Sequence, residues 1–301
     1  MRVLVTGASG FIGGLACAEL LARGHEVDAL IRRPSTNPPG TTAVAGDISS
    51  SELAVSLQQR APDCVVHLAA EIATQRDARK IEAVNVRGTE RLLAACRALA
   101  VDGRDGPRII FTSTVVTGEA HGALLDESTP LPVDTPYGRS KQEGERLVLA
   151  CGLPAIVVRP SHVYGAGGWF AQEIVSRLRQ PGRLAVIGRG ENLWDVVRGE
   201  DVASALADTA ERGGPGEIYH VVDDEPITCY EFIALVARAL GVGRPRRVPV
   251  GLARLVAGRN AVSAVTRSAR SSNAKLKREL GWTPRYASAA VGVPGAVAAL
   301  R

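Results

Sequence analysis

The chain has few aromatic residues and no long uncharged apolar run. Phe, Trp and Tyr make up 4% of the 301 residues, so a platform of stacked bases or sugars is not expected as its main binding mode. It contains no stretch of about 18 uncharged apolar residues, the length that a membrane helix needs. Residues 1–7 lack the apolar region and cleavage site of a secretory leader. We therefore expect a cytoplasmic location and no membrane partner.

Cysteine is also scarce, and its distribution excludes common cysteine-based sites. The five cysteines are scattered and include no Cys-x-x-Cys pair, which predicts buried free thiols of a reducing compartment. No cluster of His, Cys and Asp has the spacing of metal ligands, so we expect no metal site. The net charge of +5 comes without an RNA- or DNA-binding motif, so no nucleic-acid partner is expected.

The positive charge is uneven along the chain. Between Arg244 and Arg285 there are eleven basic residues and one acidic residue, Glu279. Such a run is typical of solvated surface, although it can also attract an anionic substrate.

Short apolar runs alternate with segments of helical spacing over the first half of the chain. The predicted strands are Arg2–Thr6, Glu26–Ile31, Ala43–Ala45, Cys64–Leu68, Arg108–Thr112 and Ala155–Arg159. The predicted helices are Phe11–Arg23, Ser51–Arg60, Ala78–Ala100 and Ser140–Cys151. This alternation predicts an α/β fold of the Rossmann type, a doubly wound parallel sheet with right-handed crossovers.

The alternation weakens after residue 168. The later predicted elements are helices near Phe170–Arg179, Gly199–Glu211 and Tyr230–Leu240, and strands near Leu184–Ile187 and Glu217–Val222. We therefore expect residues 1–167 to form an NADP-binding core. Residues 168–301 are expected to form mainly a smaller substrate-binding lobe that is interleaved with the core.

A glycine-rich turn follows the first predicted strand and opens the first helix. Gly7, Gly10 and Gly13 have the spacing Gly-x-x-Gly-x-x-Gly, which permits a tight turn, close approach of a pyrophosphate and close packing of the helix. The helix N-terminus adds free N–H groups and positive potential. In this strand–turn–helix context the pattern predicts a dinucleotide site. Its residues are Gly7, Ser9, Gly10, Phe11, Ile12 and Gly13.

The end of the second strand favours NADP over NAD. An NAD site usually has an acid here for the ribose hydroxyl, but this chain has Ile31 followed by Arg32 and Arg33. Arg32 can pair with a 2′-phosphate, and by strand alternation Asp28 faces the wrong way. The alternative is that the two arginines are solvent-exposed residues of a surface turn and do not bind the cofactor. The third predicted strand is followed by Asp47 and Ile48, and we expect both residues to lie near the adenine of the cofactor.

Three residues have the chemistry of a proton-transfer site. Tyr137 and Lys141 are four residues apart, which places them on one helix face, and an ammonium beside a phenol lowers its pKa. Lys141 is one of only four lysines in the chain, so its place there is not typical of the composition. Ser113 follows a predicted strand at the edge where open parallel sheets bind ligands, and its hydroxyl can polarise a carbonyl. No Gly-x-Ser-x-Gly elbow of a serine hydrolase is present.

Together these motifs resemble the extended short-chain dehydrogenases/reductases, of the NAD-dependent epimerase/dehydratase and dihydroflavonol-reductase type. The match runs nearly end to end and is carried by Thr6–Gly13, Gly46–Ile48, His67–Ala70, Asn85–Thr89, Ser113, Tyr137, Lys141, Arg159–Gly165 and Glu279–Pro284. The resemblance implies hydride transfer between NAD(P) and a carbinol carbon, with Tyr137 as general acid or base, Lys141 lowering its pKa and holding the ribose, and Ser113 orienting the substrate oxygen. It also implies cofactor contacts from Leu68, Ala69, Ala70, Pro160 and His162. A homodimer through the helices Ala78–Ala100 and Ser140–Cys151 is expected as well.

Departures from the family pattern narrow the reaction. Ser113 is followed by Thr114 and Val115, whereas sugar 4,6-dehydratases have Asp-Glu there, so dehydration is not expected. Trp194 replaces an Arg that nucleotide-sugar epimerases often carry, and Arg198, which could recruit an acidic group, replaces a His.

We therefore expect an NADP-dependent ketoreductase or alcohol dehydrogenase that acts on a small carbonyl or alcohol substrate. NAD is the alternative cofactor. The substrate-binding residues are expected to be Ser113, Thr114, Tyr137, His162 and Trp194. A nucleotide-sugar 4-epimerase or 4-ketoreductase is the alternative, and a non-catalytic cofactor sensor is a third possibility. His67 is expected to be a hydrogen-bonded strand-end residue and not a catalyst.

Overall fold

The computed structural model describes residues 1–50, 53–75, 77–100, 105–180, 182, 184–257, 262 and 265–301. Its centre is a seven-stranded sheet of order β12-β7-β5-β4-β1-β2-β3, in which all neighbouring strands are parallel. The strands are β1 (Arg2–Thr6), β2 (Glu26–Ile31), β3 (Thr42–Ala45), β4 (Cys64–His67), β5 (Arg108–Thr112), β7 (Ala155–Pro160) and β12 (Ile218–Val221). The predicted Rossmann-type fold is confirmed.

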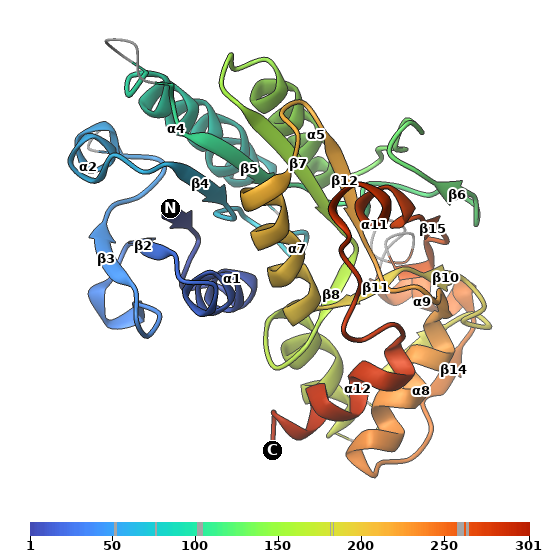
Figure 1. The fold of residues 1–301 in the computed structure, drawn as a ribbon. Helices are drawn as coiled ribbons and strands as arrows, with labels where there is room; N and C mark the ends of the chain where they lie inside the picture. The colour runs from blue at the N-terminus through green and yellow to red at the C-terminus, as the bar shows by residue number, and fades with distance from the viewer. Residues whose placement is uncertain are drawn as a thin grey trace.

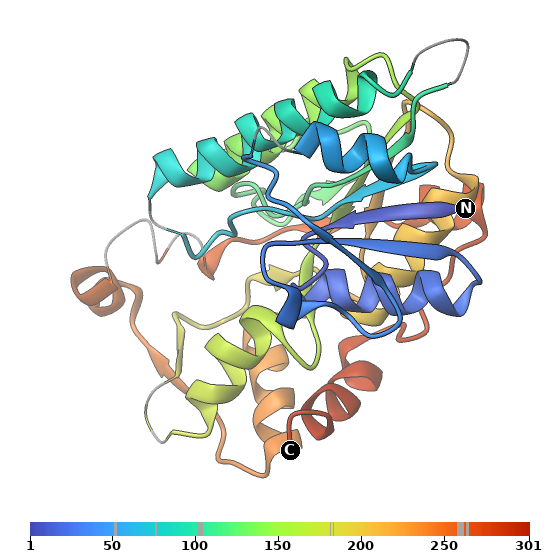
Figure 2. The same ribbon diagram turned by 90° about the vertical axis from the view of Figure 1, so that its left-hand side faces the viewer.

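Helices cover both faces of the sheet (Figures 1 and 2). On one face, α1 (Phe11–Ala22), α7 (Gly199–Arg212) and α11 (Ala274–Leu280) bury apolar side chains in one core cluster. On the other face, α2 (Leu53–Arg60), α4 (Arg87–Arg97) and α5 (Pro136–Leu149) contribute to a second cluster. Strand residues alternate between the two clusters, as Val3 and Leu4 do, because successive side chains of a strand point to opposite faces.

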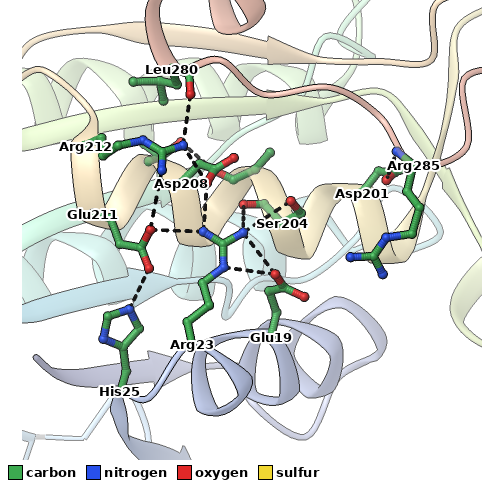
Figure 3. Close-up of polar contacts among 12 residues, drawn as sticks. Glu19, Arg23, His25, Asp201, Ser204, Asp208, Glu211, Arg212, Leu280 and Arg285 are labelled. Atoms are coloured by element: carbon green, nitrogen blue, oxygen red, sulfur yellow. Dashed lines mark hydrogen bonds and ion pairs between the residues drawn. The ribbon is translucent and has the colours of Figure 1, made fainter.

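An ion-pair network fastens α7 to the end of α1 (Figure 3). Nη1 of Arg23 lies 2.7 Å from Asp208 and 3.0 Å from Glu211, and its Nε donates to Glu19 at 2.9 Å. Nε2 of His25 lies 2.9 Å from Glu211. These partly buried contacts tie a helix from the second half of the chain to the first βα unit.

Two predicted helices differ from the observed ones. The helix predicted over Ala78–Ala100 is divided into α3 (Ala78–Ile81), a π-helical turn η2 (Glu82–Val86) and α4. The helix predicted from Ser140 begins instead at Pro136, N-capped by the hydroxyl of Thr135, so Tyr137 lies in its first turn. For the helix predicted over Ser51–Arg60, residues 51–52 lie outside the described residues and α2 is seen from Leu53.

A smaller lobe with its own aromatic core packs below the sheet (Figure 1). Its helical elements are η3 (Phe170–Val175), α6 (Ser176–Leu178), α8 (Cys229–Leu240), α9 (Val250–Ala257) and α12 (Ala289–Ala298). Short strand pairs join these elements: β8 (His162–Tyr164) with β11 (Val196–Arg198), β10 (Leu193–Trp194) with β13 (Ile227–Thr228), β9 (Ala185–Ile187) with β14 (Arg246–Val248), and β6 (Leu124–Leu125) with β15 (Arg270–Ser271). A 3-10 turn, η1 (Pro34–Thr36), follows β2. No helix among the described residues is long and apolar enough to cross a bilayer.

Candidate active site

The turn between β1 and α1 has no room for side chains at two of its glycines. Gly7 has a φ of +69°, and a Cβ on it would lie 2.8 Å from the backbone nitrogen of Ala69. A Cβ on Gly13 would lie 2.1 Å from the carbonyl oxygen of Gly7. Gly10 is the N-cap of α1, with no side-chain cap and no acid in the first turn, so the positive end of the helix faces no competing carboxylate. This arrangement fits a dinucleotide pyrophosphate.

The rest of the turn is fixed by Phe11, which packs against the smaller lobe. A Cβ on Gly165 would lie 2.6 Å from the Phe11 ring, one on Gly167 2.7 Å and one on Gly199 2.8 Å. These glycines follow β8 or open α7, so the cofactor turn is packed directly on segments of the second half of the chain. Beside Phe11, Ile12 is half-buried and Ser9 is exposed.

A chain of buried hydrogen bonds holds the loop after β4 under this turn. Oγ1 of Thr6 accepts N–H groups of Leu68 at 3.2 Å and Ala69 at 3.1 Å, and lies 2.7 Å from Nδ1 of His67. Nε2 of His67 lies 2.9 Å from Thr89, whose hydroxyl donates to a backbone carbonyl. Because both ring nitrogens are bonded and burial lowers the His67 pKa to about 3, His67 is a neutral structural residue, as predicted. Its network fixes Leu68 and Ala69, and the half-buried Ala70 follows them.

The end of β2 presents two exposed arginines and no acid. Asp28 is buried and binds Arg60 of α2 at 2.6 and 2.9 Å, so it is not available to a ribose. Arg32 and Arg33 are exposed and form no ion pair with a residue that the structure describes. Against the raising effect of burial, hydrogen bonds from a neighbouring serine and the charge of Arg32 lower the pKa of Asp47. Arg32 and Asp47 are therefore close enough to interact.

Ile48, next to Asp47, belongs to the core. It is 4% exposed, and a Cβ on Gly88 of α4 would lie 2.8 Å from its Cδ1. Its side chain therefore sets the distance between the third βα connection and α4.

Ser113 follows β5 with its hydroxyl unengaged. The residue is 3% exposed, and its Oγ has no hydrogen-bond partner among the described residues. Its backbone N–H donates to Val158 of β7 at 2.7 Å, which continues the ladder between the two strands. A buried hydroxyl without a partner is costly, and at the carboxyl edge of the sheet it is suited to a substrate oxygen.

Tyr137 and Lys141 lie on successive turns at the start of α5. Burial raises the pKa of Tyr137 to about 12, whereas the sequence predicted that the ammonium of Lys141 would lower it. Burial also lowers the pKa of Lys141 to about 8, opposed by the nearby carboxylate of Glu145. Nζ of Lys141 lies 4.7 Å from the centre of the Phe111 ring, a cation–π contact.

Behind Lys141, the carboxylate of Glu145 is held by a buried arginine. Arg159 donates to it from Nε at 2.8 Å and from Nη2 at 2.6 Å. The pair is almost fully buried, so it is sensitive to loss of either partner.

Asn85 of η2 belongs to the family motif Asn85–Thr89, but the sequence alone did not indicate a role for its side chain in the site. It is 3% exposed, and its Nδ2 donates to Ser140 of α5 and to the carbonyl of Glu71, both at 3.0 Å. Its Oδ1 accepts the N–H of Glu71 at 2.7 Å. The π-helical turn therefore links the loop after β4 to the helix that carries Tyr137.

Aromatic side chains form the wall on the side of the smaller lobe. The rings of His162 and Trp194 are stacked at 5.0 Å with a 13° interplanar angle, and Trp169 meets His162 edge-on at 5.9 Å. Nδ1 of His162 donates to the carbonyl of Asp195 at 3.0 Å, since a carbonyl only accepts. Burial and the charge of Arg267 lower the His162 pKa to about 4, so Nε2 is a neutral acceptor. Trp194 also packs in the lobe core.

Two side chains have structural roles that the sequence did not indicate. The hydroxyl of Thr114 donates to Pro160 at 3.1 Å and accepts the N–H of Val116 at 3.0 Å, so it is committed to the backbone. Arg198 is 4% exposed, pairs with Glu200 at 2.6 and 2.8 Å, and donates to the carbonyl of Gly292. Its sequence position had suggested that Arg198 could recruit an acidic substrate group, but these contacts already occupy its guanidinium.

Comparisons with known proteins agree with this geometry. Residues 3–221 match the model of the "NAD dependent epimerase/dehydratase family". A 3-diazoavenalumate denitrifying reductase of Streptomyces sp is 31% identical over 96% of this chain and 97% of its own. A 2-alkyl-3-oxoalkanoate reductase of Stenotrophomonas maltophilia is 30% identical over 81% of this chain and 77% of its own.

Solved structures give the same result. MoeE5 in complex with UDP-glucuronic acid and NAD has a TM-score of 0.82 at 28% identity, covering 99% of this chain and 98% of the other. The UDP-glucose 4-epimerase of Thermus thermophilus in complex with NAD has a TM-score of 0.83 at 26% identity, covering 100% of this chain and 99% of the other. The chain thus belongs to the NAD dependent epimerase/dehydratase family and is an NAD(P)-dependent oxidoreductase of the extended short-chain dehydrogenase/reductase type.

Proposed function

We propose that the protein is an NADP-dependent ketoreductase or alcohol dehydrogenase that acts on a small carbonyl or alcohol substrate. The observation that carries the proposal is the unengaged, buried hydroxyl of Ser113 at the carboxyl edge of the sheet. Tyr137 and Lys141 lie at the start of α5, and the loop after Ser113 packs against that start: a Cβ on Gly138 would lie 2.7 Å from the carbonyl of Thr117.

In this mechanism the reduced nicotinamide, when bound, supplies the hydride that adds to the carbonyl carbon. The pyrophosphate would be held by the turn at Gly7–Gly13 and the ribose by Lys141. Ser113 donates a hydrogen bond to the carbonyl oxygen, and Tyr137 donates its phenolic proton to the same oxygen, giving the alcohol. The ammonium of Lys141 would stabilise the phenolate that remains.

A nucleotide-sugar epimerase is less well supported. Arg198 is neutralised by Glu200, and Trp194 occupies the position where such epimerases often have an arginine. Two relatives are reductases by name, one of 3-diazoavenalumate and one of 2-alkyl-3-oxoalkanoates. The test is NADPH consumption with a panel of ketones and keto acids, with UDP-glucose and UDP-galactose assayed for interconversion without added cofactor. Interconversion with a tightly retained NAD would contradict the reductase proposal.

Arg32→Ala is expected to weaken NADPH binding by about 10- to 100-fold, the worth of a charge-assisted bond, and to leave NADH binding nearly unchanged. Arg32 is exposed and free of ion pairs with described residues, so its loss removes no native contact of that kind. Dissociation constants from fluorescence titration give the result. Arg87→Ala, an exposed arginine of α4, is the control. Equal losses for both cofactors would exclude the NADP assignment.

The rate of carbonyl reduction is expected to fall as pH rises through about 8. The pKa of Lys141 is lowered to about 8, so its ammonium is present below that pH and is lost above it, together with its stabilisation of the phenolate. Glu145→Gln should move the fall to lower pH, because the Glu145 carboxylate raises the Lys141 pKa. The measurement is kcat at saturating NADPH from about pH 6 to pH 10; a flat profile in both proteins would remove Lys141 from the mechanism.

We also propose that the protein is a cytoplasmic homodimer. Within each chain, residues 1–167 would bind NADP and residues 168–301 would mainly bind the substrate. The helices expected at the dimer interface, α3–α4 and α5, pack side by side on one face of the sheet. The five cysteines are free and buried, which supports a reducing compartment. Light scattering after gel filtration tests the dimer, and a mass equal to one chain would exclude it.

A further inference from the structure

Arg267 is a buried arginine without a carboxylate partner. It is 5% exposed and forms no ion pair with any residue that the structure describes. The two other buried arginines of the described chain are both neutralised, Arg159 by Glu145 and Arg198 by Glu200. A buried charge without an ion-pair partner is costly. Burial lowers the pKa of Arg267, and the longer-range charges of Asp195, Glu119 and Asp134, which act to raise it, do not offset that effect. Among the buried arginines of the described chain, Arg267 is thus the one that makes no direct contact with a carboxylate.

The segment that carries Arg267 bridges the loop after Ser113 and strand β10. The neighbouring Ser268 donates its N–H to Glu119 at 3.1 Å on one side, and its Oγ accepts the N–H of Leu193 at 3.0 Å on the other. The guanidinium itself donates from Nε to Gly118 and from Nη2 to Val115, the latter at 2.8 Å. Both carbonyls belong to the loop that begins at Ser113.

The charge of Arg267 also acts on two residues at the aromatic wall, His162 and Asp195. It helps to lower the pKa of His162 and acts against the burial that raises the pKa of Asp195 to about 6. The guanidinium contacts the loop that begins at Ser113, and the neighbouring Ser268 bonds Leu193, the residue before Trp194 of the aromatic wall. This segment therefore lies beside the expected substrate site.

The unused donors of this guanidinium form a fork. A guanidinium has five N–H donors, and Arg267 uses one on Nε and one on Nη2. Nη1 forms no hydrogen bond with a described residue, so its two N–H groups and the second one on Nη2 are left. The edge formed by Nη1 and Nη2 of a guanidinium is a second edge that can bind a carboxylate through two parallel hydrogen bonds.

Resting on the proposed function, we propose that Arg267 binds the carboxylate of a substrate that carries a ketone and a carboxylate in one molecule. One guanidinium without a direct carboxylate contact, beside a neutral His162, matches a single negative charge better than a pyrophosphate. Two relatives are named for carboxylate substrates, 3-diazoavenalumate and 2-alkyl-3-oxoalkanoate. Arg267 is thus a specificity residue for keto acids.

The experiment compares benzoylacetate and acetoacetate with their methyl esters, which keep the ketone and lose the charge. Wild type should show a kcat/KM about 10- to 100-fold higher for each acid than for its ester, the worth of a charged hydrogen bond. Arg267→Met should bring that ratio near one. Arg270→Met is the matched control, since Arg270 is an exposed cation of the same segment, and it should keep the ratio.

Calorimetric binding of the same four compounds to the protein with NADP⁺ separates this inference from the proposed function. Preferred binding of the acids without turnover of any compound contradicts the ketoreductase and supports the carboxylate site. Turnover of the esters with equal acid and ester affinities overturns the carboxylate site and supports the ketoreductase. Binding of UDP-glucose at least about 10-fold tighter than the acids, and lost in Arg267→Met, would assign the fork to a phosphate and overturn the inference. If Arg267→Met does not fold, the wild-type ratios decide.

Discussion

The Tyr137→Phe protein is expected to reduce ketones about 1,000-fold more slowly than wild type in kcat, within the range for loss of a positioned acid. Its NADPH dissociation constant and melting temperature should stay nearly unchanged. The substitution removes only the phenolic hydroxyl, which forms no hydrogen bond with a described residue, and keeps the ring in place at the start of α5. Single-turnover kinetics with saturating NADPH, fluorescence titration and thermal unfolding give the three quantities.

The matched control is Tyr230→Phe, because the Tyr230 ring packs under Arg247 on the smaller lobe, and this protein should keep full activity. If Tyr137→Phe retained more than about a tenth of the wild-type rate, a side chain other than Tyr137 would supply the proton. The next candidate for the proton donor is Asp195, which follows Trp194 of the aromatic wall and whose pKa is raised to about 6 by burial. In that case Asp195→Asn would abolish the rate; under the proposed mechanism it changes substrate affinity and leaves a measurable kcat.

The cofactor half of the molecule was predictable because its determinants are local. The β-branched run at Arg2–Thr6 and the glycines after it act within a few residues of their own position, and the observed β1 and α1 follow them. The same holds for β5, whose bounds match the prediction. For α5 the helical pattern predicts a start at Ser140, four residues later than the observed Pro136. The local signal for the true start is nevertheless present, because Thr135 is a good N-cap and Pro136 suits the first helical position.

The substrate half depends on contacts between distant segments, which no local pattern encodes. Arg198 had the sequence position of an anion-binding residue, but the carbonyl of Gly292, ninety-four residues later, and the carboxylate of Glu200 occupy it. Arg267 looked like one cation of a solvated basic run, and only the packing of its segment between the Ser113 loop and β10 shows that it is buried. The π-helical turn at Asn85 likewise depends on a tertiary bond to Ser140. Sequence spacing alone predicts a regular helix there.

Gly13→Ala is expected to lower dinucleotide affinity by at least about 100-fold and to destabilise the protein by about 1–3 kcal/mol, the cost of overpacking a tight site. Its Cβ would lie 2.1 Å from the carbonyl oxygen of Gly7 and 2.8 Å from Cα of Ala8. Both are backbone atoms, so the turn itself must move. The matched control is Gly14→Ala, one residue along α1, where a Cβ would have its nearest neighbour at 3.9 Å. That protein should bind cofactor normally and gain about 0.5–1 kcal/mol, since alanine favours a helix more than glycine does.

Gly10→Ala separates loss of binding from loss of folding. Its Cβ would lie 3.1 Å from the carbonyl oxygen of Gly7, a contact that a small shift relieves, so the melting temperature should change little. The Cβ would nevertheless stand at the N-cap of α1, on the edge that a pyrophosphate approaches, and NADPH affinity should fall by about 10-fold or more. Equal affinities in the Gly10, Gly13 and Gly14 variants would mean that the dinucleotide does not bind at this turn. A graded loss that follows the backbone clearance would identify the turn as the phosphate site independently of any turnover assay.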